Sequence, residues 1–145
     1  MKLERFLSHD EQQLITKSIA AAETRTSGEI RVHLTPRCRG DAVKAAKRVF
    51  DSLRMYETRR RNGVLIYIAV ESRKLAILGD VGINRKVAAG YWDEEIALLS
   101  QALKAGRNVE GIVAVIENIG SKLAEHFPYE PDDENELPND ISYEP

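Results

Sequence analysis

An unbroken apolar segment at residues 64–70, Val-Leu-Ile-Tyr-Ile-Ala-Val, constrains the fold of this chain more than any other feature. The segment is too short for an ordinary buried helix, and its β-branched and aromatic content is typical of a strand covered on both faces. Four polar residues at 71–74 separate it from a second apolar run at 75–78. Because a short polar loop joins the two runs, we expect an antiparallel hairpin.

A further strand is predicted at residues 29–35, where Ile30, Val32 and Leu34 alternate with polar residues. This alternation is typical of a half-exposed strand and places His33 on its exposed face. Asp41 is a candidate N-cap for a helix that runs to about residue 54. A strand, a helix and the central strand form a βαβ unit with parallel strands, so the 75–78 strand runs opposite to both.

Three more long helices follow from apolar spacing. The S-x-x-E pattern of Ser8 and Glu11 predicts a capped helix that ends near residues 26–28. Helices are also expected from about residue 92 to 105 and from 109 to about 126, with a short helical turn at 85–89. Gly111 and Gly120 weaken the last helix, which indicates close packing there. The class is therefore α/β, with C-terminal helices and a mixed sheet.

Length and charge divide the chain into one domain and a tail. The 145 residues, 43% of them hydrophobic, suit a single domain at 1–128. From residue 127 onward there are seven acidic residues and no Lys or Arg, so residues 1–126 carry 21 basic against 16 acidic side chains. We expect residues 129–145 to form a disordered acidic tail, because they offer little apolar surface to offset the entropy of ordering.

Composition also limits the function. The single Cys38 excludes a disulfide framework, and the three histidines show no metal-ligand spacing. No apolar run is long enough for a transmembrane helix and no signal peptide is evident, so we expect a soluble, cytoplasmic, monomeric protein. The modest basic excess and few exposed aromatics argue against nucleic acid as a partner.

Strand direction brings three polar, glycine-bearing loops to one edge of the sheet, at residues 26–29, 61–63 and 79–84. Glu29, Asp80 and Asn84 could supply hard oxygen ligands there for calcium or magnesium. The competing interpretation is that these residues only cap turns and fix the hairpin. Ser27, Asn62 and Arg61 are the supporting candidates from the same loops.

Two carboxylates brought close at this edge would resist joint ionisation unless a positive charge lies beside them. A divalent cation is the first candidate for that charge. The internal alternative is Arg61, which the same topology places at this edge. In that case the constellation is a structural ion pair.

Several of these segments also resemble a known family. Five motifs carry the resemblance: TSGEIRV, DAxxxAxxxF from Asp41 to Phe50, RNGVLIYIA, ILGDVGIN and the Tyr91-Trp92-Asp93 position. Their order resembles that of the TPM-domain family. This family includes a thylakoid-lumen repair protein, a nematode receptor-associated protein and many bacterial members. The resemblance implies a three-layer α/β/α sandwich around a small mixed sheet. It also implies calcium binding and acid phosphatase activity as found in some members, with Asp93 as a further supporting residue.

Two functions therefore remain open. The first is a divalent-cation-binding interaction module, whose partner is an unidentified protein. The second is a low-turnover, metal-dependent phosphatase that acts on a phosphorylated substrate with Asp80 as nucleophile or metal ligand. No established phosphatase, P-loop, zinc-protease or EF-hand motif is present. Glu29 and Asp80 serve both hypotheses, so the sequence does not decide between them.

Overall fold

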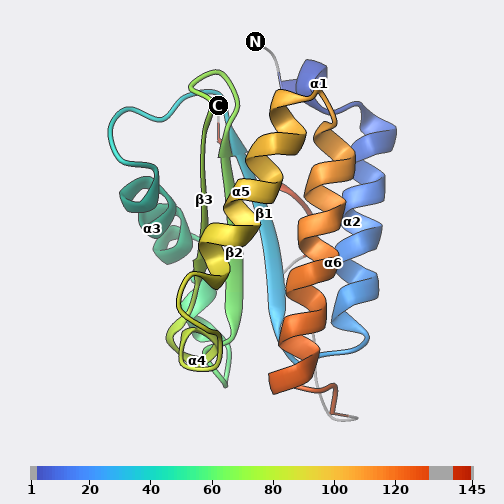
Figure 1. The fold of residues 1–145 in the computed structure, drawn as a ribbon, viewed down its shortest axis with the longest axis vertical. Helices are drawn as coiled ribbons and strands as arrows, with labels where there is room; N and C mark the ends of the chain where they lie inside the picture. The colour runs from blue at the N-terminus through green and yellow to red at the C-terminus, as the bar shows by residue number, and fades with distance from the viewer. Residues whose placement is uncertain (1–2, 131–138, 145) are drawn as a thin grey trace.

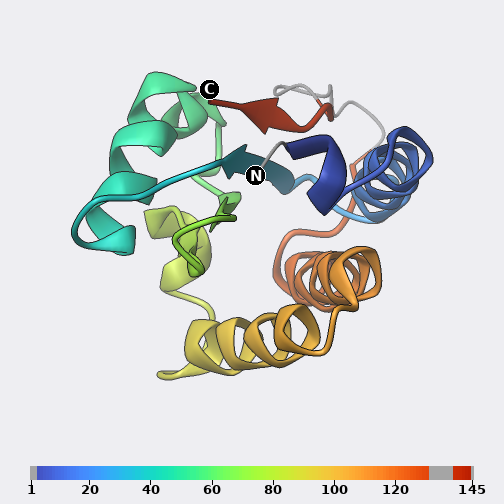
Figure 2. The same cartoon turned by 90° about the horizontal axis from the view of Figure 1, so that it is seen from above.

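The computed structural model describes residues 3–130 and 139–144. A four-stranded sheet forms the middle layer, with α3 on one side and α2, α5 and α6 on the other (Figures 1 and 2). The elements in chain order are α1 (Leu3–Phe6), α2 (His9–Glu23), β1 (Glu29–Thr35), α3 (Ala42–Ser52), a 3₁₀ turn η1 (Met55–Glu57), β2 (Gly63–Ala69), β3 (Lys74–Gly79), α4 (Val81–Asn84), α5 (Tyr91–Lys104), α6 (Asn108–His126) and β4 (Ser142–Tyr143). This is the expected α/β/α sandwich.

The strand order β3-β2-β1-β4 confirms the predicted topology and adds one strand to it. β1 and β2 are parallel, with Glu29 opposite Gly63, whereas β2 and β3 are antiparallel, with Val64 opposite Gly79. The start of β1, the start of β2 and the end of β3 therefore lie at the same edge, as strand direction required.

Alternate residues of β2 belong to two separate cores, which explains its unbroken apolar sequence. Val64, Ile66 and Ile68 pack into the cluster formed with α2, α5 and α6. Leu65 and Tyr67 pack into the second cluster, beneath α3. All seven residues of the strand are buried. A strand with helices on both faces has no side that can tolerate a polar residue.

Local sequence signals set the helix ends as expected. Ser8 and Glu11 form a complete capping box, with Ser8 N donating to Glu11 Oε1 at 2.9 Å and Glu11 N donating to Ser8 Oγ at 3.1 Å. Asp41 caps α3 by accepting from Val43 N at 3.2 Å. The short helix predicted at 85–89 instead lies at Val81–Asn84, because Asp80 caps it by accepting from Val81 N at 2.8 Å.

The glycines of α6 mark close packing between helices. A Cβ atom on Gly111 would lie 2.5 Å from Ala102 Cβ of α5, and one on Gly120 would lie 2.8 Å from Ala22 Cβ of α2. Both distances are shorter than any stable carbon contact. The two glycines therefore allow α6 to approach α5 and α2, as their cost in helix propensity indicated.

β1 is buried on both faces, so its predicted half-exposed character is wrong. Glu29 is 3% exposed and His33 is 4% exposed. Polar alternation alone indicated a solvent-facing side. Glu23 of α2 lies beside Glu29, and Ser142 of the C-terminal segment lies beside His33. These residues come from other parts of the chain, so the local pattern does not predict the burial of β1.

The expected disorder of residues 129–145 is contradicted where the structure describes this segment near its end. Ser142–Tyr143 form β4, parallel to β1 at His33 and Leu34, and Glu144 N donates to Leu34 O at 3.0 Å. Ile141, at 8% exposure, joins the main core. Composition averaged over the tail conceals this short apolar anchor. Residues 131–138 and 145 lie outside the described residues.

None of the helices in the described ranges combines the length and the apolar sequence needed to cross a bilayer.

Candidate functional site

The three predicted loops meet at one edge of the sheet, and main-chain hydrogen bonds tie them together. Asp80 N donates to Gly63 O at 2.9 Å, and Gly82 N donates to Arg61 O at 2.8 Å. Glu29 N donates to Asn62 O at 3.4 Å. The predicted convergence of the segments 26–29, 61–63 and 79–84 is therefore confirmed.

The loops at 61–63 and 79–84 cross at Gly82 with almost no space between them. A Cβ atom built on Gly82 would lie 2.0 Å from Arg60 O and 2.6 Å from Arg61 O. Both obstacles are main-chain atoms, which cannot rotate away as a side chain can. Only glycine permits this crossing, and the crossing fixes where Asp80 and Arg61 stand.

Asp80 and Arg61 form a two-point ion pair at the crossing. Arg61 Nε lies 2.6 Å from Asp80 Oδ2, and Arg61 Nη2 lies 2.9 Å from Asp80 Oδ1. The Asp80 side chain is only 5% exposed, whereas that of Arg61 is 46% exposed. Hydrogen bonding to Asp80 raises the pKa of Arg61 above its ordinary value. The positive charge expected beside the carboxylates is thus supplied, at Asp80, by Arg61.

The backbone of Arg61 is held in the left-handed region, with φ of 52°. Residues other than glycine adopt this region at a cost, which persists only where the surrounding contacts impose it. The ion pair and the hydrogen bond from Gly82 to Arg61 O are contacts of this kind. No local pattern predicts this conformation, because arginine is not a residue that favours it.

Asn84 is at the same edge, but both ends of its amide already have protein partners. Its Nδ2 donates to Gly79 O at 2.8 Å, and its Oδ1 accepts from Trp92 Nε1 at 2.8 Å. Asn84 therefore fastens α4 to the end of β3 and to the first turn of α5. The amide oxygen could coordinate a cation only if it kept its hydrogen bond from Trp92 Nε1 at the same time, or if that hydrogen bond broke.

Glu29 pairs with Glu23 of α2, a residue that sequence reasoning missed. Burial and the charge of Glu29 raise the pKa of Glu23 to about 9, with a hydrogen bond between the two carboxyl groups. Glu23 Oε2 also accepts from Ile30 N at 2.9 Å. At neutral pH Glu23 is therefore protonated, so that two negative charges do not face each other at Glu23 and Glu29. At Asp80 the negative charge is instead balanced by Arg61. The two predicted carboxylates share an edge but have separate partners.

The remaining candidates have structural roles or lie apart. Asn62 Nδ2 donates to Ser27 Oγ at 3.5 Å, and Asn62 N donates to Thr58 Oγ1 at 3.1 Å. Asp93 is exposed in the first turn of α5. Within residues 3–130 and 139–144, no three His, Cys, Asp or Glu side chains are grouped closely enough to hold a metal ion. A cation at this edge would therefore need amide, hydroxyl or main-chain oxygens in addition to the carboxylates.

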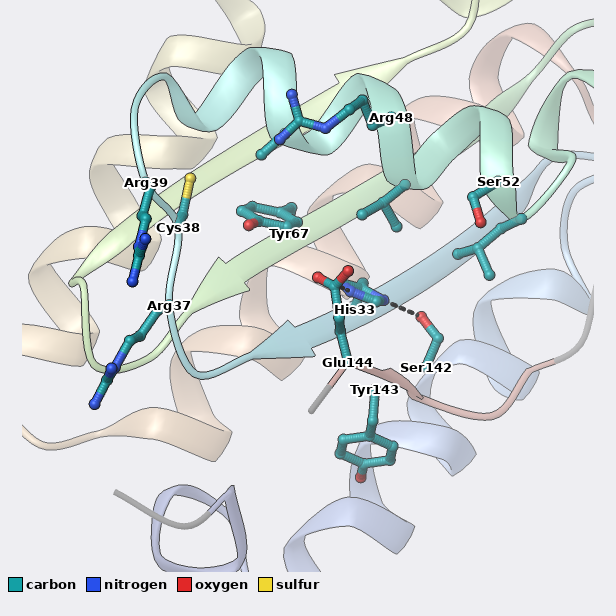
Figure 3. Close-up of a pocket in the computed structure, with 13 residues that line it drawn as sticks. His33, Arg37, Cys38, Arg39, Arg48, Ser52, Tyr67, Ser142, Tyr143 and Glu144 are labelled. Atoms are coloured by element: carbon teal, nitrogen blue, oxygen red, sulfur yellow. Dashed lines mark hydrogen bonds and ion pairs between the residues drawn. The ribbon is translucent and has the colours of Figure 1, made fainter.

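A cavity of about 540 Å³ opens at the other end of the sheet, where no motif of the sequence predicts a site. His33 of β1 and Tyr67 of β2 line it, with Arg48 of α3 and Glu144 of the C-terminal segment also on its wall (Figure 3). The predicted exposure of His33 concealed this site. Its polar lining comes from segments more than 100 residues apart in sequence, so no local motif could have indicated it.

The fold and the loop edge define a class of α/β/α sandwich domains with a mixed four-stranded sheet. The family model described as "TPM domain" matches residues 1–122. The chain therefore belongs to the TPM domain family.

Two solved structures are similar to this one. The BA42 protein of the psychrophilic bacterium Bizionia argentinensis, solved by NMR, is 43% identical over 99% of both chains, with a TM-score of 0.90. The N-terminal domain of the cg2496 protein of Corynebacterium glutamicum is 19% identical over 81% of this chain and 74% of its own, with a TM-score of 0.60. The second likeness concerns the fold alone. A search of curated proteins finds no match to this chain.

Proposed function

We propose that this TPM domain is a divalent-cation-binding interaction module, in which calcium or magnesium exchanges with Arg61 at the loop crossing. The observation that carries the proposal is the unequal burial of the ion pair: Asp80 is 5% exposed, and its partner guanidinium belongs to a side chain that is 46% exposed. A buried carboxylate requires a counter-charge. The one it has here is open to solvent and therefore open to competition.

The oxygen atoms at the crossing suit a hard cation once Arg61 has moved away. Asp80 would supply the carboxylate, the Asn84 amide a neutral oxygen, and the main chain its carbonyl groups, which are the ligand types that calcium and magnesium prefer. A bound ion would supply charge and order the two loops. The ordered loops would then present a defined surface to a protein partner.

Thermal unfolding with added calcium or magnesium tests this proposal. An ion that binds only the native state adds about 2.7 kcal/mol to the free energy of unfolding at a hundredfold excess over its Kd. We expect a rise in Tm for the wild type and a larger rise for Arg61→Gln, because the competing guanidinium is gone. Asp80→Asn should abolish the rise.

The matched control is Arg85→Gln, which removes an exposed arginine just beyond α4. This variant should respond to the ions as the wild type does. If neither ion changes the Tm of the wild type or of Arg61→Gln, the pair of Arg61 and Asp80 is purely structural and the proposal fails.

The phosphatase alternative requires an Asp80 oxygen that is free to attack or to hold a metal. Both oxygens face Arg61, and Oδ1 also accepts from Val81 N. Nothing in this geometry favours turnover over binding. Hydrolysis of a chromogenic phosphomonoester with and without magnesium, for the wild type and Asp80→Ala, separates the two functions. Magnesium-dependent turnover that Asp80→Ala removes would favour the enzyme.

A further inference from the structure

The cavity lined by His33, Tyr67, Arg48 and Glu144 lies away from the loop crossing. It opens beneath α3 near the carboxyl ends of the parallel strands β1 and β2, and the C-terminal segment forms one wall (Figure 3). In open α/β sheets, ligands commonly bind outside the carboxyl ends of the strands. Its volume of about 540 Å³ is in the range of small-molecule sites.

The charge around this cavity is positive. Arg37, Arg39 and Arg48 line it, against Glu144 as the acidic residue of the lining. Arg37 is paired with Glu71 at 3.4 Å. In the described part of the chain, Arg39 and Arg48 form no ion pair or hydrogen bond that would occupy their guanidinium groups. Two guanidinium groups without carboxylate partners favour an anionic ligand.

The floor of the cavity places a second requirement on that ligand. His33 Nδ1 lies 2.8 Å from Ser142 Oγ, and Ser142 Oγ lies 3.3 Å from Val32 O, to which it donates. A hydroxyl has one hydrogen, and we assign that of Ser142 to Val32 O, so that Ser142 Oγ accepts from His33 Nδ1–H. In the neutral ring, Nε2 is then a bare acceptor.

This acceptor is buried and has no hydrogen-bond partner. Burial lowers the pKa of His33, which keeps the ring neutral near pH 7, although Glu144 opposes the shift. The Tyr67 ring stacks on the imidazole with centroids 5.9 Å apart and holds its orientation. A buried acceptor without a donor costs free energy that a suitable ligand would recover.

Glu144 does not meet this need. Its Oε2 lies 3.7 Å from His33 Nε2, beyond hydrogen-bond distance, and its side chain is 56% exposed. An ionised carboxylate is an acceptor only, so it cannot donate to neutral Nε2. It does show that a carboxylate fits beside the imidazole, and it is free to move aside.

We propose that this cavity is a binding site for a small hydroxy-carboxylate. Its carboxylate lies among Arg39 and Arg48, and its hydroxyl donates to His33 Nε2. Glu144 competes with the ligand carboxylate for the same positive surroundings. The site is independent of cation binding at Asp80.

The 145-residue chain can be titrated with glycolate and with acetate, which differ only in the hydroxyl group, at ionic strength held constant with sodium chloride. Nitrogen-15 NMR of the His33 ring and the backbone amides gives both the affinity and the contact. We expect glycolate to bind about fivefold more tightly than acetate, the ratio that one net hydrogen bond provides. The His33 Nε2 resonance should move with glycolate and not with acetate.

Variants at exposed positions separate the contributions without disturbing the core. Arg48→Gln should weaken both ligands at least fivefold, whereas Lys44→Gln, at an exposed position of the same helix, should weaken neither. Glu144→Gln should tighten both, because a competing charge is removed. Asp80→Asn should leave both affinities unchanged.

Equal affinities for glycolate and acetate would overturn the proposal, and so would an Nε2 resonance that glycolate does not move. Binding that Arg48→Gln and Lys44→Gln weaken equally would reduce the effect to general surface charge and would also overturn it. None of these outcomes bears on cation binding at the loop crossing, whose test is the ion-dependent Tm of Arg61→Gln.

Discussion

Arg61 and Asp80 face each other across the crossing of two loops, with Nε 2.6 Å from Oδ2 and Nη2 2.9 Å from Oδ1. The carboxylate is buried and the guanidinium is half-exposed. Removing Arg61 leaves the buried Asp80 carboxylate without a counter-charge and with little access to water, whereas removing Asp80 leaves a guanidinium that water can still solvate. The two substitutions therefore have unequal consequences for stability.

Asp80→Ala should lower the free energy of unfolding by about 2 kcal/mol, because it removes the hydrogen bonds to Arg61 together with the cap of α4. Urea denaturation measures the change. Asp93→Ala, which removes an exposed carboxylate in the first turn of α5, is the control and should cost well under 1 kcal/mol. Equal losses for the two variants would contradict a specific role for the pair.

Stability should fall as pH rises, because of Glu23. Its pKa is about 9 in the folded state against 4.5 ordinarily, so the native state binds the extra proton between these values. The stabilisation is fully present below about pH 4.5 and is lost as pH rises toward 9. Glu23→Gln should flatten this part of the Tm profile and raise the Tm at pH 8.

The control for that profile is Glu117→Gln, since Glu117 is an exposed carboxylate on α6. It should leave the slope of Tm against pH as in the wild type. A wild-type Tm that does not decrease between pH 5 and pH 9 would show that Glu23 is ionised throughout.

Gly82→Ala should be among the most damaging single-methyl additions in the chain, at about 3 kcal/mol, because its Cβ would meet main-chain oxygens at 2.0 and 2.6 Å. Gly28→Ala is a matched comparison. Its Cβ would lie 2.8 Å from the nearest atom of the Leu123 side chain, which is buried in the core but can shift more readily than main-chain oxygens, so a smaller cost of about 2 kcal/mol is expected. Chemical denaturation of both variants measures which substitution lowers the free energy of unfolding more. A smaller loss for Gly82→Ala than for Gly28→Ala would mean that the two loops separate easily.

Ile141→Ala should lower the free energy of unfolding by about 2 kcal/mol, because the side chain is 8% exposed within the main core. Glu144→Gln, at an exposed position of the same segment, should be nearly neutral. Amide exchange offers a second measurement, since Glu144 N, just after β4, donates to Leu34 O of β1. Rapid exchange there and an unchanged stability for Ile141→Ala would restore the original expectation of a disordered tail.

The sequence was sufficient where the information is local. The capping box at Ser8, the cap at Asp41 and the apolar run of β2 each predict the structure of the residues around them. The directions of the strands then place Glu29 and Asp80 at one edge of the sheet. Arg61 was identified as the internal alternative to a cation because the same topology places it there.

What the sequence could not show depends on distant segments. Glu23 belongs to the polar side of a helix by periodicity, and only the packing of α2 against β1 brings its carboxyl group to Glu29. His33 is buried against Tyr67 of β2 and Ser142 of β4, and β4 lies more than 100 residues later in a segment whose average composition is acidic. The cavity beside His33 was missed for the same reason.

The two-residue strand β4 also bears on whether β1 can pair with strands of other molecules. Without it, the outer edge of β1 would expose unpaired main-chain groups, which act as a template for strands of other molecules. Ser142–Tyr143 cover the end of that edge, and the Glu23 carboxyl group occupies Ile30 N near its beginning. Loss of residues 142–144, with Ile141 retained in the main core, should therefore convert β1 into an edge prone to aggregation even where the helices remain intact.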